Sequence, residues 1–169
     1  MKVSIHSLAV EQVSHTLNQM LGFLDKAAAY AEAKKFDVSV LVNARLAPDM
    51  LPFTRQIQIA TDNAKFGVAR LAGVDAPKFE DNETTLDELR ARIKKTIDFI
   101  KSVPASAFEG GEDRDIKIAV PGRTFEMKGL AYLRGWVLPN VFFHVTTAYL
   151  ILRHNGVDVG KRDFLGDVK

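Results

Sequence analysis

The chain contains no cysteine. This absence excludes disulfide bonds, thiolate metal ligands and a cysteine nucleophile, and it fits a reducing compartment. An excess of charge of one sign is also missing, because the formal net charge is only +2 at pH 7. No stretch gathers Lys and Arg together with aromatic residues. We therefore expect no nucleic-acid partner.

Long uninterrupted hydrophobic runs are missing as well. The longest apolar stretch, residues 136–152, contains Pro, Asn and His and is shorter than a typical membrane span. Near the N-terminus, Glu11 and Gln12 interrupt the apolar residues, which is not the pattern of a signal peptide. These features predict a soluble cytoplasmic protein with no membrane partner.

The rest of the composition is that of an ordinary globular protein. The chain has 169 residues, of which 47% are hydrophobic and 26% charged, enough for one domain with a proper core. It has no internal repeat, no low-complexity segment and no interdomain linker. We expect residues 1–169 to form a single domain.

Residues 136–155 form the stretch around which we expect the domain to be organised. Pro139 suits the first turn of a helix, where its missing N–H is not needed. From there the apolar residues cover every side of the helix, a pattern typical of a helix that is buried all round. Asn155 and Gly156 end the stretch, with Gly156 as the expected left-handed cap.

Apolar residues at helical spacing predict three more long helices, at residues 4–33, 50–72 and 85–103. The expected N-caps are Ser4 for the first and Asp49 for the second, and Thr85 with Glu88 forms a capping box for the third. Residues 34–48 are expected to be a connection with a short helical turn, and residues 74–83 a loop.

Between the third and fourth main helices, residues 115–127 alternate between apolar and polar residues around the turn Pro121-Gly122. This pattern predicts a β-hairpin that packs on the helices. Residues 129–137 are expected to form a short helix, and Phe164 and Leu165 in the tail are expected to pack back onto the domain. The fold class predicted is therefore an all-α four-helix bundle with a small β-hairpin.

Asn140 and His144 are four residues apart inside the last helix, so they share one face. A metal site here would use His144 and the neutral oxygen of Asn140, with Asp62 or Gln58 supplied by helix 50–72. The alternative is that His144 is a structural histidine satisfied by a hydrogen bond from helix 50–72, with Asp62 or Gln58 as the first choices for its partner.

Charged residues on the other helices have a simpler interpretation. Arg55, Gln58, Asp62 and Lys65 are expected to form a solvated face of helix 50–72, and so are the cationic residues 90–95 of the third helix, Arg92 among them. His6 and His15 are nine residues apart and cannot face one site. No serine or threonine has a nearby base in a pattern that would mark a nucleophile.

Six stretches carry a family resemblance, and they are Arg45–Met50, Gln56–Asp62, Ala69–Gly73, Leu138–Tyr149, Ile151–Gly156 and Gly160–Gly166. Together they resemble an uncharacterised bacterial family within the DinB/YfiT-like four-helix-bundle superfamily. The resemblance implies helices in an up-down-down-up order and a homodimer. It also implies a divalent metal held by three histidines, one from the second helix and two from a His-x-x-x-His pair in the last.

Counted back from Gly156, that histidine pair would fall on Asn140 and His144, and only the second is a histidine. Helix 50–72 contains no histidine and offers Gln56, Gln58 and Asp62 instead. The three-histidine site of the superfamily is therefore incomplete here. The fold carries over from the resemblance, whereas metal dependence and enzyme activity do not.

These observations predict a small-molecule-binding protein with a degenerate metal site centred on His144, with Asn140, Asp62 and Gln58 as the other candidate ligands of a divalent metal. The alternative is a metal-dependent or thiol-cofactor-dependent transferase or isomerase of small molecules. A homodimer is expected for a second reason, since a last helix that is apolar on all sides has more surface than one bundle core covers. No residue identifies a substrate or a catalytic group.

Overall fold

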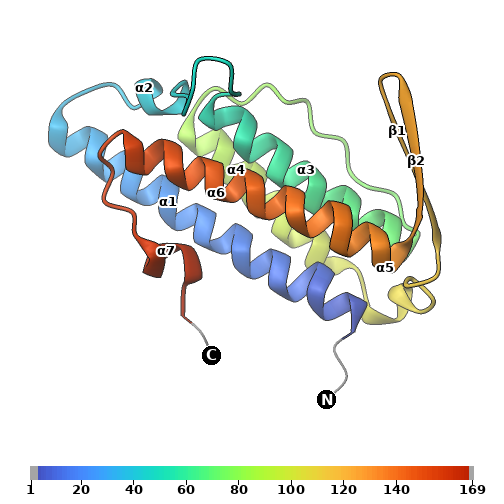
Figure 1. Cartoon of the computed structure of the whole chain (residues 1–169). Helices are drawn as coiled ribbons and strands as arrows, with labels where there is room; N and C mark the ends of the chain where they lie inside the picture. The colour runs from blue at the N-terminus through green and yellow to red at the C-terminus, as the bar shows by residue number, and fades with distance from the viewer. Residues whose placement is uncertain (1–3, 168–169) are drawn as a thin grey trace.

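Four long helices make up most of the molecule, as the computed structural model shows for residues 4–167 (Figure 1). They are α1 (Val13–Lys34), α3 (Phe53–Ala72), α4 (Leu86–Ser102) and α6 (Leu138–His154). Each packs against two of the others, so that α1, α4, α3 and α6 close a ring around one core. The prediction of an all-α four-helix bundle with a β-hairpin between its third and fourth main helices is confirmed.

The first helix begins close to its predicted start. The Ser4 hydroxyl oxygen accepts a hydrogen bond from the backbone N–H of Ser7, as an N-cap does. A π-helical turn, η1 (Ser7–Gln12), leads directly into α1. The helix ends at Lys35, whose left-handed backbone (φ 59°) starts the connection to the short helix α2 (Ser39–Val42).

The second and third main helices confirm most of the predicted ends. α3 ends at Gly73, and the Thr85–Glu88 capping box opens α4 with both of its hydrogen bonds present. The prediction of Asp49 as the N-cap of α3 is wrong, because the helix starts at Phe53 with Pro52 in the capping position. Pro52 has an extended backbone (φ −68°, ψ 167°), of which its ring fixes φ, and the helix begins at the next residue.

A short 3₁₀ turn, η2 (Ala105–Phe108), links α4 to the hairpin. The hairpin consists of β1 (Asp115–Val120) and β2 (Arg123–Lys128), paired antiparallel with Ile116 opposite Met127. It lies at the end of the bundle beside α5 (Gly129–Tyr132) (Figure 1). Ile116 and Ile118 of β1 are buried, so the hairpin packs on the helices as predicted.

The last helix is longer than its sequence suggests. Pro139 lies in the first turn of α6, as predicted, but α5, the π-helical turn η3 (Leu133–Val137) and α6 follow each other without a break. Proline lacks the N–H that an α-helix would use at this point, and the wider π-helical turn directly precedes it. Gly156 follows the helix with φ +91°, which confirms the expected left-handed cap.

The prediction that the last helix is buried all round is wrong. Phe143 and Leu150 are 58% and 40% exposed, whereas Val141, Val145 and Ala148 are fully buried. A helix in a ring of four has one side turned away from the core, whatever residues occupy it. Within residues 4–167, Gly129–His154 is the one helix long and apolar enough to span a membrane by length and composition, which is weak evidence because core helices of bundles pass the same test.

The tail forms α7 (Lys161–Leu165), which packs on α1. Phe164 confirms the prediction, because its ring stacks on Phe23 of α1 and contacts Tyr149 of α6. The prediction that Leu165 packs onto the domain is wrong, because its side chain is 45% exposed.

α3 packs closely against η3, the turn that continues into α6, at a position where only a glycine fits without a shift. A Cβ atom on Gly67 of α3 would lie 2.6 Å from Cγ1 of Val137. We therefore expect Gly67→Ala to destabilise the protein by roughly 1–3 kcal/mol through overpacking. Urea denaturation followed by circular dichroism measures this change.

Gly22→Ala is the matched control, because Gly22 also lies within a helix but a Cβ there meets no atom within 4 Å. We expect this variant to be more stable than the wild type by roughly 0.5–1 kcal/mol, through helix propensity alone. Equal effects of the two substitutions on stability would show that a Cβ atom at position 67 does not overpack the contact with Val137.

Candidate functional site

His144 lies on the side of α6 that faces α3, where one side chain of α3 meets it. Its Nδ1 is 2.8 Å from Oε1 of Gln56. The Gln56 side-chain amide is oriented by its own donor group, which hydrogen-bonds the Leu51 carbonyl at 2.8 Å. Oε1 can only accept, so the imidazole donates from Nδ1. Nε2 is then the unprotonated nitrogen of a neutral ring.

Two further features describe this imidazole. Burial lowers the pKa of His144, so the ring is neutral at neutral pH. Across residues 4–167, no protein atom hydrogen-bonds Nε2, and Nε2 is not one of the buried atoms without a partner. The nitrogen is therefore a hydrogen-bond acceptor open to solvent. The exposed ring of Phe143 lies beside it, edge to face with a centroid separation of 5.1 Å.

The predicted partners of His144, Asp62 and Gln58, are wrong, because Gln56 holds that place. Gln56 is three residues after Phe53 and four before Ala60, which puts it on the buried stripe of α3. Gln58 is two residues further, about 200° round the helix, and faces α4 instead. The spacing that identified the apolar stripe would also have identified Gln56.

Asn140, the second candidate beside His144, bonds its own helix. Its amide nitrogen donates to the Trp136 carbonyl one turn earlier, at 2.7 Å. The structure thus brings His144 and Asn140 together on α6 and leaves Asp62 and Gln58 in a separate cluster.

These donors do not fit the three-histidine metal site of the superfamily. Around His144 the neighbouring polar groups are the amides of Gln56 and Asn140, which are poor partners for a metal that prefers nitrogen ligands. Asp62, the one carboxylate among the candidates, is already paired with two cations, Arg92 and Lys65. The described part of the chain contains no group of three His, Asp or Glu side chains placed to hold a metal ion.

The cluster around Asp62 corrects a second prediction, which was that the charged residues of helix 50–72 and of the third helix form solvated faces. Arg92 of α4 and Lys65 of α3 are 2% and 1% exposed. Arg92 lies one position before Ile93 and three after Leu89, at the edge of the apolar stripe, which was the available signal that it turns inward. Its guanidinium donates to the Thr61 hydroxyl at 2.7 Å and pairs with Asp62 at 2.8 Å.

The connection between α3 and α4 supplies the remaining members of this cluster. Asp81 and Glu83 lie 2.8 and 3.0 Å from the Arg92 guanidinium. Burial alone would raise the pKa of each carboxyl, but hydrogen bonds from Arg55, Gln58 and Arg92 outweigh it and lower both. Both side chains are therefore ionised at neutral pH.

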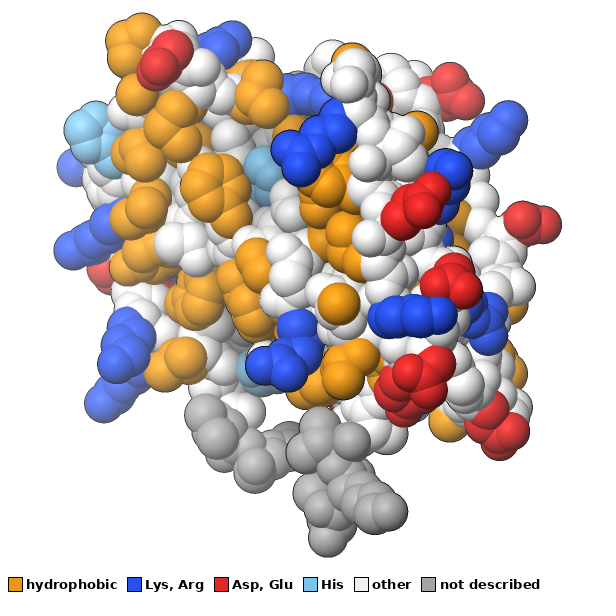
Figure 2. All heavy atoms as spheres, turned by 45° about the vertical axis from the view of Figure 1, so that its right-hand side comes forward, with side chains coloured by type: hydrophobic (Ala, Val, Ile, Leu, Met, Phe, Trp, Pro, Cys, Tyr) orange, Lys and Arg blue, Asp and Glu red, His pale blue; other side chains and the backbone are white. Residues whose placement is uncertain are grey.

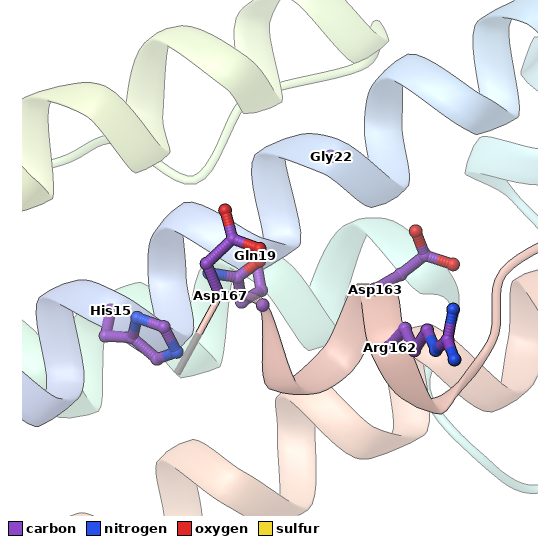
Figure 3. A pocket seen from close by; sticks show the side chains of 7 residues that line it. His15, Gln19, Gly22, Arg162, Asp163 and Asp167 are labelled. Atoms are coloured by element: carbon purple, nitrogen blue, oxygen red, sulfur yellow. The ribbon is translucent and has the colours of Figure 1, made fainter. Parts of the chain in front are cut away.

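An open groove of about 720 Å³ lies elsewhere, between α1 and the C-terminal segment (Figure 3). His15 and Gln19 come from α1, and Arg162 and Asp163 from α7. Two of its polar groups already have partners, because His15 Nε2 lies 2.7 Å from the Leu165 carbonyl oxygen and Lys26 donates to Asp163 at 2.8 Å. This groove is where α7 attaches to α1, so we place the candidate site at His144.

Comparisons with known proteins agree with this geometry at the level of fold. A family model described as a domain of unknown function (DUF1993) matches residues 5–165. The crystal structure of a DinB family member from Shewanella denitrificans is 44% identical, with a TM-score of 0.90 over 97% of this chain and 93% of that one. No curated protein matches the chain.

The hydrogen bond between His144 and Gln56 predicts a specific loss of stability. In His144→Leu, the buried Oε1 of Gln56 loses its donor, which we expect to cost roughly 1–3 kcal/mol. Adding Gln56→Leu removes the stranded acceptor, so the double variant should lose less stability than the two single changes summed. Chemical denaturation of the four proteins measures the coupling, and strict additivity would show that the bond contributes nothing.

Proposed function

The chain belongs to the DUF1993 family of uncharacterised DinB-like proteins, and from this premise we propose that it binds a small molecule at His144. The observation that supports the proposal is the neutral imidazole with Nδ1 engaged by Gln56 and Nε2 open to solvent. A nitrogen that is held in one tautomer and lacks a protein partner is prepared to accept a hydrogen bond from a ligand.

The surroundings of Nε2 define the chemistry of the ligand. Phe143 offers an exposed aromatic ring, and Asn140 is a polar residue one turn away on α6. No charged side chain occurs from Trp136 to Leu152, so α6 itself offers no counter-ion for an anion or a cation. The ligand class that fits is an apolar, preferably aromatic, neutral molecule with one hydrogen-bond donor.

Phenol is the simplest probe of this class, and anisole is its match without a donor. We expect phenol to shift the ring-nitrogen resonance of His144 in a nitrogen-15 NMR titration and to bind roughly fivefold more tightly than anisole, as one hydrogen bond allows. His144→Leu should bind both with equal affinity, because the acceptor is gone.

Val40→Ser is the control variant, since Val40 on α2 is as exposed as Phe143, at 58%. It should preserve the preference for phenol, whereas Phe143→Ser should weaken the binding of both probes. Equal affinity of the wild type for phenol and anisole would contradict the proposal.

We also propose that the protein is a homodimer through the outer face of α3 and α6. Phe143 and Leu150 are seven residues apart on α6, and Phe66 of α3 is 37% exposed. Hydrophobic side chains gather on one part of the surface shown in Figure 2. The α6 part of this face has no charged side chain, so it can pack against its own copy about a two-fold axis without a charge partner. Phe66 lies beside the cations of Lys65 and Arg70.

A second copy on this face has a consequence for the ligand site. Phe143 belongs both to the outer face and to the surroundings of His144. The bound molecule would therefore lie between two chains, shielded from water, and would not lie on an open surface. Binding and association are then expected to reinforce each other.

Leu150→Glu tests the dimer. The substitution places a carboxylate at a position of the outer face that is 40% exposed, so the folded monomer tolerates it while the paired surface does not. We expect a dimer for the wild type and a monomer for the variant in light scattering at about 50 μM. Val40→Glu, on α2, should remain dimeric, and a monomeric wild type would contradict the proposal.

A further inference from the structure

The connection between α3 and α4, residues 74–84, crosses the whole bundle, because the two helices run in the same direction (Figure 1). It forms no helix or strand. Such a long segment without backbone pairing has to be held by side chains. Three of them, Phe79, Asp81 and Glu83, make the contacts, and we call residues 74–84 the crossover.

Arg92 is the anchor for the two acidic side chains. It is buried on α4 and lies within 3.0 Å of carboxylate oxygens from both Asp81 and Glu83. On the α3 side, Arg55 donates to Asp81 at 2.9 Å and Gln58 donates to Glu83 at 2.8 Å. The crossover is thus attached to both helices through the same two carboxylates.

Phe79 covers a second buried cation. The ammonium group of Lys65 lies 4.0 Å from the centre of the Phe79 ring, and the Arg92 guanidinium lies 5.0 Å from it on α4. Lys65 is only 1% exposed. The ring of Phe66 on α3 lies 4.5 Å from the same ammonium, so Phe79 is the part of this cover that belongs to the crossover.

The charges around this contact balance one another. Arg55, Lys65 and Arg92 supply three positive charges, and Asp62, Asp81 and Glu83 supply three negative ones. The flanking groups are Glu88, which caps α4, and Lys95, whose ammonium lies 6.0 Å from the Phe79 ring. Without the charges of Asp81 and Glu83, three cations would face Asp62 alone, two of them out of water. Such an excess of buried positive charge destabilises the closed crossover.

We propose that the crossover is a strap that closes over Lys65 and Arg92 and opens, with the bundle still folded, when Asp81 and Glu83 lose their charge. The bundle can stay folded when the crossover opens, because the apolar contacts among α1, α3, α4 and α6 do not involve the crossover. Opening exposes two adjacent cations on α3 and α4. It also joins the cavities of about 280 and 370 Å³ that share Glu83 as a wall.

Amine-reactive labelling of the full chain tests the strap, because Lys65 becomes more accessible when Phe79 moves away. The probe is an acetylating ester used at about pH 8, where model lysines are partly deprotonated, with the extent at each lysine read by peptide mass spectrometry. In Asp81→Asn/Glu83→Gln we expect the labelling rate of Lys65 to rise roughly tenfold over the wild type, as for a local opening. Lys94, exposed on α4, should be labelled at the same rate in both proteins.

Glu80→Gln is the matched control, since Glu80 is an exposed carboxylate of the crossover with no ion pair among the described residues. It should leave Lys65 protected, and the far-UV circular dichroism of all variants should equal that of the wild type. Should the double variant not fold, each single substitution is expected to raise the Lys65 rate by a smaller factor. A Lys65 rate that stays at the wild-type value in folded single and double variants overturns the proposal, as does loss of helical signal in step with labelling.

Discussion

The close contact between α3 and α6 is the constraint on which the rest of the structure depends. Gly67 lets the two helices approach until Val137 fills the place of a side chain. At the other end of the same contact, this approach brings Gln56 within hydrogen-bond distance of His144. A wider spacing would leave the buried side-chain oxygen of Gln56 without a donor, at a cost of roughly 1–3 kcal/mol.

α3 satisfies polar groups in two different ways on its two sides. Toward α6 it uses one neutral hydrogen bond, between an amide and an imidazole whose pKa is lowered by burial. Toward α4 it uses a network of ions centred on Arg92. The first arrangement leaves one nitrogen open for a ligand, whereas the second occupies its groups with partners from the same chain. This difference is why we assign the candidate site to the α6 side.

The helices could be predicted well because each depends on local signals. The Thr85–Glu88 capping box, Gly73 and Gly156 mark helix ends through interactions within a few residues, and all three were confirmed. Asp49 failed as a cap because Pro52 sets the start of α3. The central helix was predicted to be buried all round because its sequence has no polar face, yet its outer side is exposed. Apolar composition cannot show which side of a helix lacks a neighbour.

By itself, the sequence determined the four long helices, most of their ends, the hairpin, and the presence of a histidine inside the last helix that needs a hydrogen-bond partner. Periodicity and capping are short-range properties, so they can be read along the chain. Only the tertiary structure decided that Gln56 and not Asp62 or Gln58 meets His144, and that Arg92 and Lys65 are buried. Those facts depend on the rotation of α3 relative to two different helices. That rotation is set by contacts between residues far apart in the chain, such as Gly67 with Val137, which no local pattern contains.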